Sequence, residues 1–285
     1  MRGFFALLSW LLIAAAASAQ LAVNVGDERI AIVRQGDKTP ILEQIAKPDF
    51  RPYIHPIAAP DGKGVFTEFS PGHHKHQTGL YVGHTRINGK DYFHNPGANF
   101  FTRKSLAGSA KGNQAAWTVV YDLNGAAGPV LRETQAWTLT DLGTSYLLDL
   151  DWRGEALVDV TVGKYSYGGV FVRMPHKGQG AAVNSEGLKN GQAEQKRSKW
   201  VDIGLPIEGR DKDDWAHIAI LDHKSNPAHP SPWRVDGQLG VSPTRAILGD
   251  WTIPKGETAA AKYRFVIYAG PLDAKRIDAA FESWK

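Results

Sequence analysis

Apolar and polar residues alternate strictly over one stretch in the middle of the chain. Residues 148–153 read Leu-Asp-Leu-Asp-Trp-Arg, inside a longer run from Ser145 to Arg153. Successive side chains of a β-strand point to opposite faces, so the leucines and the tryptophan share one face and the charged residues share the other. This pattern is typical of an antiparallel strand with one buried and one solvated face.

Other short runs rich in β-branched and aromatic residues are separated by Gly, Pro, Asn and Asp. The runs that predict further strands are residues 116–123, 134–140, 158–162, 169–173, 217–222 and 262–268. Helical spacing of apolar residues is almost absent, and residues 271–284 are the best helix candidate. The pattern predicts an all-β chain, folded as a large antiparallel β-sandwich with few short helices.

The N-terminus has the pattern of an export signal. Arg2 precedes an almost wholly apolar run from Phe4 to Ala17, and Ala17-Ser18-Ala19 has the small side chains of a cleavage site. A membrane anchor would need ~20 apolar residues, and this run is shorter. We therefore expect residues 1–19 to be a secretory signal peptide and residues 20–285 to form a single domain in the periplasm or outside the cell, with no membrane span after signal removal.

Composition excludes several classes of site. The chain has no cysteine, which rules out thiol catalysis, thiolate metal sites and disulfides. Its 33 Lys and Arg residues are interspersed with 29 Asp and Glu residues, for a net charge of +4. The densest basic patch, residues 196–199, is more typical of a solvated loop than of a nucleic-acid contact. No nucleic-acid partner is expected, and the sequence does not indicate an oligomeric state.

Histidines are concentrated in one segment. Six of the ten lie between residues 51 and 94, and three of these lie within positions 73–76. Histidine titrates near neutral pH and is a common metal ligand. In an extended chain, His74 and His76 would share one face. The pair predicts either two imidazoles facing a substrate or a divalent metal site, and a hydrogen-bonded turn is the purely structural alternative.

A proline-rich segment, residues 221–233, carries a second set of polar groups. It reads Leu-Asp-His-Lys-Ser-Asn-Pro-Ala-His-Pro-Ser-Pro-Trp, and its three prolines exclude a helix. Such a loop suits a binding rim, with Trp233 exposed to a ligand, and a rigid structural crossover is an equal alternative.

Residues 164–174 bring Tyr165, Tyr167 and Arg173 together around Gly168-Gly169. Paired glycines allow a bulge or a close approach of the backbone. Alternation places both tyrosines on one face, either in a cleft, where tyrosine can act as an acid or base, or in the core.

Two long motifs resemble the bacterial PmoA family, also called the DUF6807 domain. The first motif runs from Arg51 to Pro56 and continues through residues 60–62 and 74–81; the second is residues 222–233. Residues 167–169 and 199–202 are weaker matches. Many members read His-x-His-His-Arg-Gly where this chain reads His-Lys-His-Gln-Thr-Gly at 74–79, so a mechanism that needs that arginine is not supported here.

The family label suggests a methane oxygenase subunit. Such a subunit is an integral membrane protein, and residues 20–285 contain no apolar run able to span a bilayer. The resemblance instead implies an exported β-sandwich similar to mutarotase-like and polysaccharide-lyase sandwiches. Relatives are associated with the breakdown of plant or algal glycans.

These observations predict a secreted carbohydrate-active protein, a hydrolase or lyase that acts on an oligosaccharide by histidine-based acid/base catalysis. The predicted catalytic residues are Arg51, His55, His74, His76 and His223. The predicted substrate-binding residues are Tyr53, Gln77, Tyr167, Asn226, His229 and Trp233. A retaining glycosidase would need two carboxylates, for which Glu68 and Asp222 are the only candidate pair. The composite site requires the two motifs to meet in space.

Two other functions stay open from the sequence. One is a non-catalytic glycan-binding protein that stacks sugars on Trp233 and on tyrosines. The other is an exported protein that binds a divalent metal through His74 and His76. No other cofactor is predicted.

Overall fold

Two eight-stranded antiparallel sheets dominate the computed structural model, which describes residues 20–72 and 74–284. The first sheet contains, in spatial order, β1 (Leu21–Val25), β2 (Arg29–Arg34), β3 (Leu42–Ile45), β4 (Tyr53–Ile57), β5 (Leu80–Gly83), β11 (Gly169–Val172), β16 (Val241–Pro243) and β15 (Trp233–Val235). The second contains β12 (Ala181–Asn184), β13 (Trp200–Leu205), β14 (Trp215–Asp222), β18 (Thr258–Gly270), β9 (Ser145–Ala156), β8 (Pro129–Asp141), β7 (Gln114–Asn124) and β6 (Phe101–Lys111).

The remaining elements are short. β10 (Val160–Val162) pairs with β17 (Trp251–Ile253) in a separate two-stranded sheet. Within residues 20–72 and 74–284, the helical elements are two 3₁₀ turns, η1 (Asn190–Gln192) and η2 (Arg245–Leu248), and one α-helix, α1 (Ala274–Glu282). In the described part of the chain, no helix has the length and apolar character that crossing a membrane requires.

The strand pattern read from the sequence is confirmed. In β9, Leu148, Leu150 and Trp152 are buried, while Arg153 on the opposite face is exposed. Each predicted strand coincides with an observed one, and α1 lies inside the predicted helical segment. The prediction of an all-β antiparallel sandwich is therefore confirmed. The predicted signal peptide lies outside the described residues.

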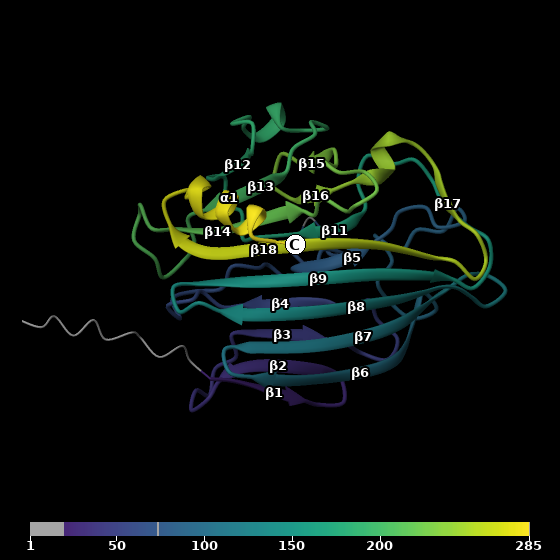
Figure 1. Cartoon of the computed structure of the whole chain (residues 1–285), viewed down its shortest axis with the longest axis horizontal. Coiled ribbons are helices and arrows are strands. Elements are labelled where there is room, and N and C mark those ends of the chain that lie inside the picture. Colours follow the sequence, from purple (N-terminus) through teal and green to yellow (C-terminus); the bar gives the residue numbers. More distant parts are fainter. Residues whose placement is uncertain (1–19, 73, 285) are drawn as a thin grey trace, which may run out of the picture.

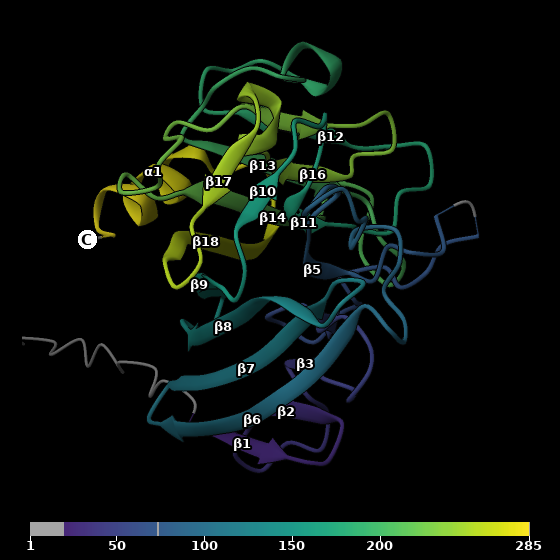
Figure 2. The same ribbon diagram turned by 90° about the vertical axis from the view of Figure 1, so that its right-hand side faces the viewer.

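The two large sheets pack face to face around a shared apolar core (Figures 1 and 2). The indole N–H of Trp117 in β7 donates to Gln44 Oε1 in β3 at 3.2 Å, and the hydroxyl of Tyr121 in β7 donates to the carbonyl of Lys47 at 2.7 Å. These two bonds cross from one sheet to the other. Figure 1 shows the long strands β6–β9 running together across the molecule.

The helix α1 covers the outer face of the second sheet. Ile277 and Phe281 pack with Trp200, Leu221 and Tyr268 from β13, β14 and β18. An aspartate caps the helix, since the side chain of Asp273 accepts from the amide of Arg276. This packing buries one face of β14, the strand that precedes the proline-rich segment.

Candidate functional site

A polar pocket with a volume of about 120 Å³ forms where the histidine-rich segment meets β11 and β15. Its lining combines imidazole, phenol, amide, guanidinium and carboxylate groups with two phenylalanine rings. The lining residues are His74, His76, Gln77, Phe93, His94, Tyr167, Phe171, Arg234 and Asp236. Four of the predicted site residues, His74, His76, Gln77 and Tyr167, thus meet in one place.

A turn, not a strand, presents the two histidines. The amide of Gln77 donates to the carbonyl of His74 at 2.9 Å. Gly79 ends the turn with φ of +83°, and a Cβ there would lie 2.5 Å from the carbonyl oxygen of Ile54, so only glycine fits. The rings of His74 and His76 lie 5.7 Å apart. They are neighbours as predicted, but strand alternation was the wrong reason.

Arg51 lies beneath this turn and is wholly buried. Its guanidinium donates to the carbonyl of His76 at 2.5 Å, to the carbonyl of Phe93, and to Thr78 Oγ1 at 3.2 Å. It also stacks on the ring of Tyr81, 3.7 Å from the centroid. Arg51, a predicted catalytic residue, is therefore not exposed for direct contact with a substrate. Arg51 instead fixes the backbone that carries His76.

A carboxylate, an imidazole and a phenol form a chain of hydrogen bonds that ends in the pocket. Asp91 Oδ2 lies 2.7 Å from His94 Nδ1, and His94 Nε2 lies 3.1 Å from the hydroxyl of Tyr167. Asp91 Oδ1 also accepts from the amides of Phe93 and His94, which holds the carboxylate in place. Such a chain can pass a proton between Tyr167 and His94. Sequence reasoning assigned no role to Asp91 or His94, although their three-residue spacing was the available signal.

His76 and Tyr167 are both uncharged at pH 7. Burial, followed by the charges of His94 and Arg51, lowers the pKa of His76 to about 4. The His76 imidazole is therefore neutral at pH 7 and can accept a proton. Burial and the neighbouring Tyr165 raise the pKa of Tyr167, so its phenol stays protonated and can donate. The rings of His76 and His94 are 4.5 Å apart, and His94 is hydrogen-bonded to Tyr167. The proton acceptor and the proton donor therefore lie close together.

A second buried guanidinium lies behind the histidine pair. Arg173 Nε donates to Gln77 Oε1 at 2.5 Å, and its Nη2 lies 3.5 Å from His74 Nδ1. Within the described residues, neither Arg173 nor Arg51 forms an ion pair with a carboxylate. Two buried positive charges make the pocket better suited to an anion than to a cation. Across residues 20–72 and 74–284, no group of three or more His, Asp or Glu side chains is arranged to hold a metal ion.

A family model described as a family of unknown function, DUF6807, matches residues 22–282. The chain belongs to the DUF6807 family. The resemblance seen in the two sequence motifs is therefore confirmed over nearly all of the described chain. No curated protein matches this DUF6807 chain significantly.

Solved structures similar to the DUF6807 chain include carbohydrate enzymes. An α-galactosidase from Lactobacillus brevis has a TM-score of 0.43 and 10% identity, with 90% of this chain and 40% of that chain covered. The GH36 α-galactosidase AgaA from Geobacillus stearothermophilus, in complex with stachyose, has a TM-score of 0.41 and 9% identity over 88% of this chain and 40% of that chain. A galactose mutarotase related enzyme from Lactobacillus acidophilus has a TM-score of 0.32 and 7% identity over 87% and 97% of the two chains. The DUF6807 chain thus spans about 40% of the length of these α-galactosidases.

The proline-rich segment does not join the polar pocket. Trp233 is fully buried, and its indole N–H donates to the carbonyl of Ser198 at 3.0 Å, so its predicted contact with ligand is wrong. The next residues of the chain, Arg234 and Asp236, reach the pocket instead. Sequence reasoning missed both because they follow the motif rather than belong to it.

The remaining polar residues of this segment are bound into the scaffold. His223 lies against Trp284, with ring centroids 4.5 Å apart, and its Nδ1 lies 2.7 Å from Ser225 Oγ. The ring of His229 lies 5.9 Å from that of Phe281 in α1. Asn226 exchanges hydrogen bonds with the backbone of Lys262 at 2.7 Å. The prediction that the two motifs form one composite site is therefore wrong.

The other predicted residues face elsewhere. His55 Nδ1 lies 3.0 Å from Thr67 Oγ1, and His55 lines a separate groove together with Glu68. Tyr53 is buried, with its ring 5.4 Å from that of Phe69. Asp222 is fully buried and hydrogen-bonded within the proline-rich segment, so Glu68 and Asp222 do not form a carboxylate pair. Neither His55 nor Tyr53 lines the polar pocket.

Proposed function

We propose that this DUF6807 protein is an exported enzyme that cleaves an acidic oligosaccharide by β-elimination. The observation that carries this proposal is the Asp91–His94–Tyr167 chain, which ends beside the neutral imidazole of His76 in one polar pocket. Export rests on the signal-peptide pattern. The choice of a sugar substrate rests on the family resemblance and on the mixture of polar groups and aromatic rings in the pocket.

The reacting groups divide into a base and an acid. The His76 imidazole takes the proton from the carbon next to the substrate carboxylate, and the electron pair left behind forms a carbon–carbon double bond. The bond between the neighbouring carbon and the glycosidic oxygen breaks. Tyr167 gives its phenolic proton to that oxygen and is reprotonated by a proton that His94 takes from water, while His76 releases its proton to water.

Arginine side chains supply the positive charge in this mechanism. Arg234 lines the pocket with its guanidinium 5.7 Å from the Tyr167 ring centroid, and one of its nitrogens pairs with Glu194 at 2.7 Å. The rest of this guanidinium can hold the substrate carboxylate and stabilise the charge that develops on it during proton abstraction. The buried Arg51 and Arg173 strengthen the positive potential.

Elimination is favoured over a two-carboxylate glycosidase mechanism. Of the described residues that line the pocket, only Asp236 carries a carboxylate, and its Oδ1 already accepts from the amides of Gln238 and Gly240. Retaining and inverting glycosidases both rely on a pair.

The test is incubation with a panel of uronate-containing and neutral oligosaccharides. Elimination gives products of unchanged total mass and a new absorbance from the conjugated double bond. Products heavier by one water without that absorbance would show a hydrolase, and binding without any product would show a glycan-binding protein; either result contradicts the proposal.

Substitution of the proposed acid tests the site itself. Tyr167→Phe removes one oxygen atom, and we expect turnover to fall at least 100-fold, in line with the usual contribution of general acid catalysis. The matched control is Tyr146→Phe, which removes a hydroxyl that bonds to Arg34 away from the pocket. Full turnover by Tyr167→Phe would contradict the assigned role.

A further inference from the structure

A second pocket lies between the two large sheets. Tyr167 lines the polar pocket, and the next two residues, Gly168 and Gly169, line this one. Other walls come from Val82 in β5, Trp152 in β9 and residues 259–261 and 263 of β18. None of the residues to which we assign acid/base roles lines it.

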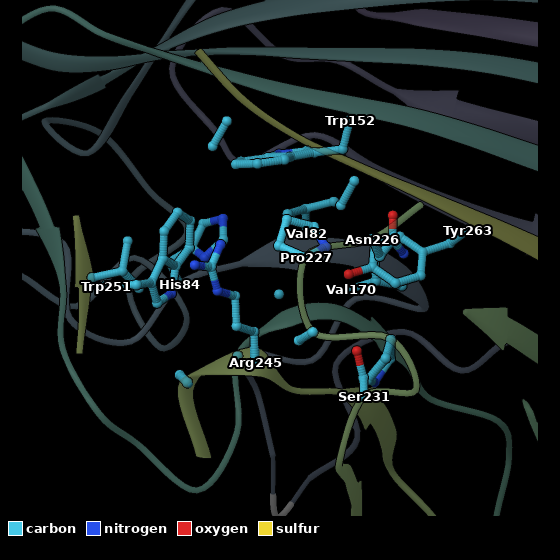
Figure 3. A pocket seen from close by; sticks show the side chains of 18 of the residues that line it. Val82, His84, Trp152, Val170, Asn226, Pro227, Ser231, Arg245, Trp251 and Tyr263 are labelled. Atoms are coloured by element: carbon cyan, nitrogen blue, oxygen red, sulfur yellow. The ribbon is translucent and has the colours of Figure 1, made fainter. Parts of the chain in front are cut away.

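The walls of this pocket are mainly apolar. Trp152 and Tyr263 contribute rings from the second sheet, and Trp251 contributes a ring from β17 (Figure 3). Aliphatic side chains such as Val82 and Val170 fill the surface between them. Trp251 and Arg245 are half-buried, which places them at the mouth.

A cationic group lies at one side of this apolar space. The guanidinium of Arg245 lies 4.2 Å from the Trp251 ring centroid and, within the described residues, has no carboxylate within ion-pair distance. Burial lowers the pKa of this guanidinium, but it remains charged at pH 7 because its ordinary value is so high. An unpaired, partly buried cation favours an anionic ligand.

An imidazole whose Nε2 has no hydrogen-bond partner in the described part of the chain lies beside it. His84 is 9% exposed, and its Nε2 is buried with no hydrogen-bond partner among the described residues. Buried polar atoms usually have a partner, because leaving one unpaired costs free energy. Figure 3 shows His84, Arg245 and Trp251 on one side of the pocket in this view, with Asn226 and Tyr263 on the other.

We infer that this pocket binds a small monocarboxylate with a short apolar chain. The carboxylate lies against Arg245 and His84, and the apolar part packs between Trp152, Trp251 and the aliphatic wall. A sugar ring fits less well, because most of its hydroxyl groups would be buried against apolar side chains without hydrogen bonds.

The size of the cavity limits the ligand. Its volume is about 70 Å³, which is less than the roughly 150 Å³ of an engineered apolar protein cavity that binds benzene. The apolar part of the ligand is therefore smaller than a benzene ring, such as a short chain of a few carbons, and its charged end lies in the open mouth. This site is separate from the proposed active site, so neither inference depends on the other.

The test uses isothermal titration calorimetry of the intact protein at pH 7 with propionate and butyrate as probes. Butyramide, which has nearly the shape of butyrate but no charge, is the matched control ligand. We expect saturable binding of at least one carboxylate, at least tenfold tighter than that of butyramide. No binding of either carboxylate, or equal binding of butyrate and butyramide, would overturn the inference.

Two substitutions locate the binding. Arg245→Gln removes the charge and Ala261→Leu fills the cavity, and we expect each to weaken carboxylate binding at least tenfold. Arg153→Gln removes a charge from the exposed face of β9 and should leave affinity unchanged. Thermal melts of each variant confirm folding. Unchanged affinity in the folded Arg245→Gln and Ala261→Leu variants would place the ligand elsewhere and overturn the inference.

Discussion

Two buried arginines, Arg51 and Arg173, form hydrogen bonds with the histidine-rich segment. Where many family members carry a histidine and an arginine, this chain has Gln77 and Thr78. Both side chains are contacted by guanidinium groups from distant parts of the chain: Arg173 donates to Gln77, and Arg51 donates to Thr78. Positive charge at this site therefore comes through tertiary contacts, which the spacing of residues within the motif does not reveal.

Buried histidines predict a pH dependence of stability. Burial lowers the pKa of His84 to about 4, against an ordinary value of 6.5. Between these values the unfolded chain binds a proton that the folded chain does not, so the free energy of unfolding falls as pH drops from 6.5 to 4. The contribution of His84 to this loss is roughly 3 kcal/mol at most.

Urea denaturation at pH 7 and pH 4.5 measures this loss. His84→Gln should lose less stability between the two pH values than the unsubstituted protein. His176→Gln, a substitution at a half-buried histidine of a loop, is the control and should keep the full loss. An equal pH dependence in His84→Gln and the unsubstituted protein would show that His84 titrates near its ordinary value.

At the scale of elements, the proline-rich segment is a structural crossover. Asp222, at the end of β14, accepts hydrogen bonds from Asn226 Nδ2 at 2.7 Å and from the amide of Ser231 at 2.8 Å, and it lies 3.1 Å from His229 Nδ1. One buried carboxylate therefore organises the whole loop between β14 and β15. Of the two predictions that the sequence left open, the rigid crossover describes the hydrogen bonding of the loop, and part of the loop, including Asn226 and Ser231, also lines the second pocket.

Removal of that carboxylate should loosen the loop. Asp222→Ala leaves several buried donors without an acceptor, and we expect a loss of about 3 kcal/mol in the free energy of unfolding. We also expect faster cleavage within residues 223–232 in limited proteolysis. Asp151→Ala, at a partly exposed ion pair with Arg153, is the control and should change stability by less than about 0.5 kcal/mol. Unchanged proteolysis in Asp222→Ala would mean that the prolines alone hold the loop.

At the scale of the whole molecule, one apolar cluster connects both large sheets. It includes Leu42 and Ile54 from the first sheet and Trp117, Trp137 and Leu148 from the second. Neither sheet could keep its inner face buried without the other. The sheets should therefore fold and unfold together.

We expect residues 20–285 to unfold in a single cooperative transition. Tryptophan fluorescence and far-ultraviolet circular dichroism should give the same midpoint, and the calorimetric and van't Hoff enthalpies should agree. Two separated transitions would contradict the prediction of a single domain.

The sequence by itself determined the class of fold and the position of seven of the 18 strands found in the described residues. Alternation in β9 and the short apolar runs of β7, β14 and β18 depend only on local geometry, because side chains of a strand alternate between its faces whatever the strand packs against. The sequence also identified the pair of histidines and Tyr167.

Only the tertiary structure decided which of these residues share a site. The pocket combines the histidine pair with His94, Arg234 and Asp236, which come from separate segments of the chain, and Asp91 is hydrogen-bonded to His94. Trp233, by contrast, is buried in the core, although the next residue, Arg234, lines the pocket. Composition and spacing do not report which face of a short strand is covered by the opposite sheet. Which side chains are buried and which line the pocket depends on how the two sheets pack.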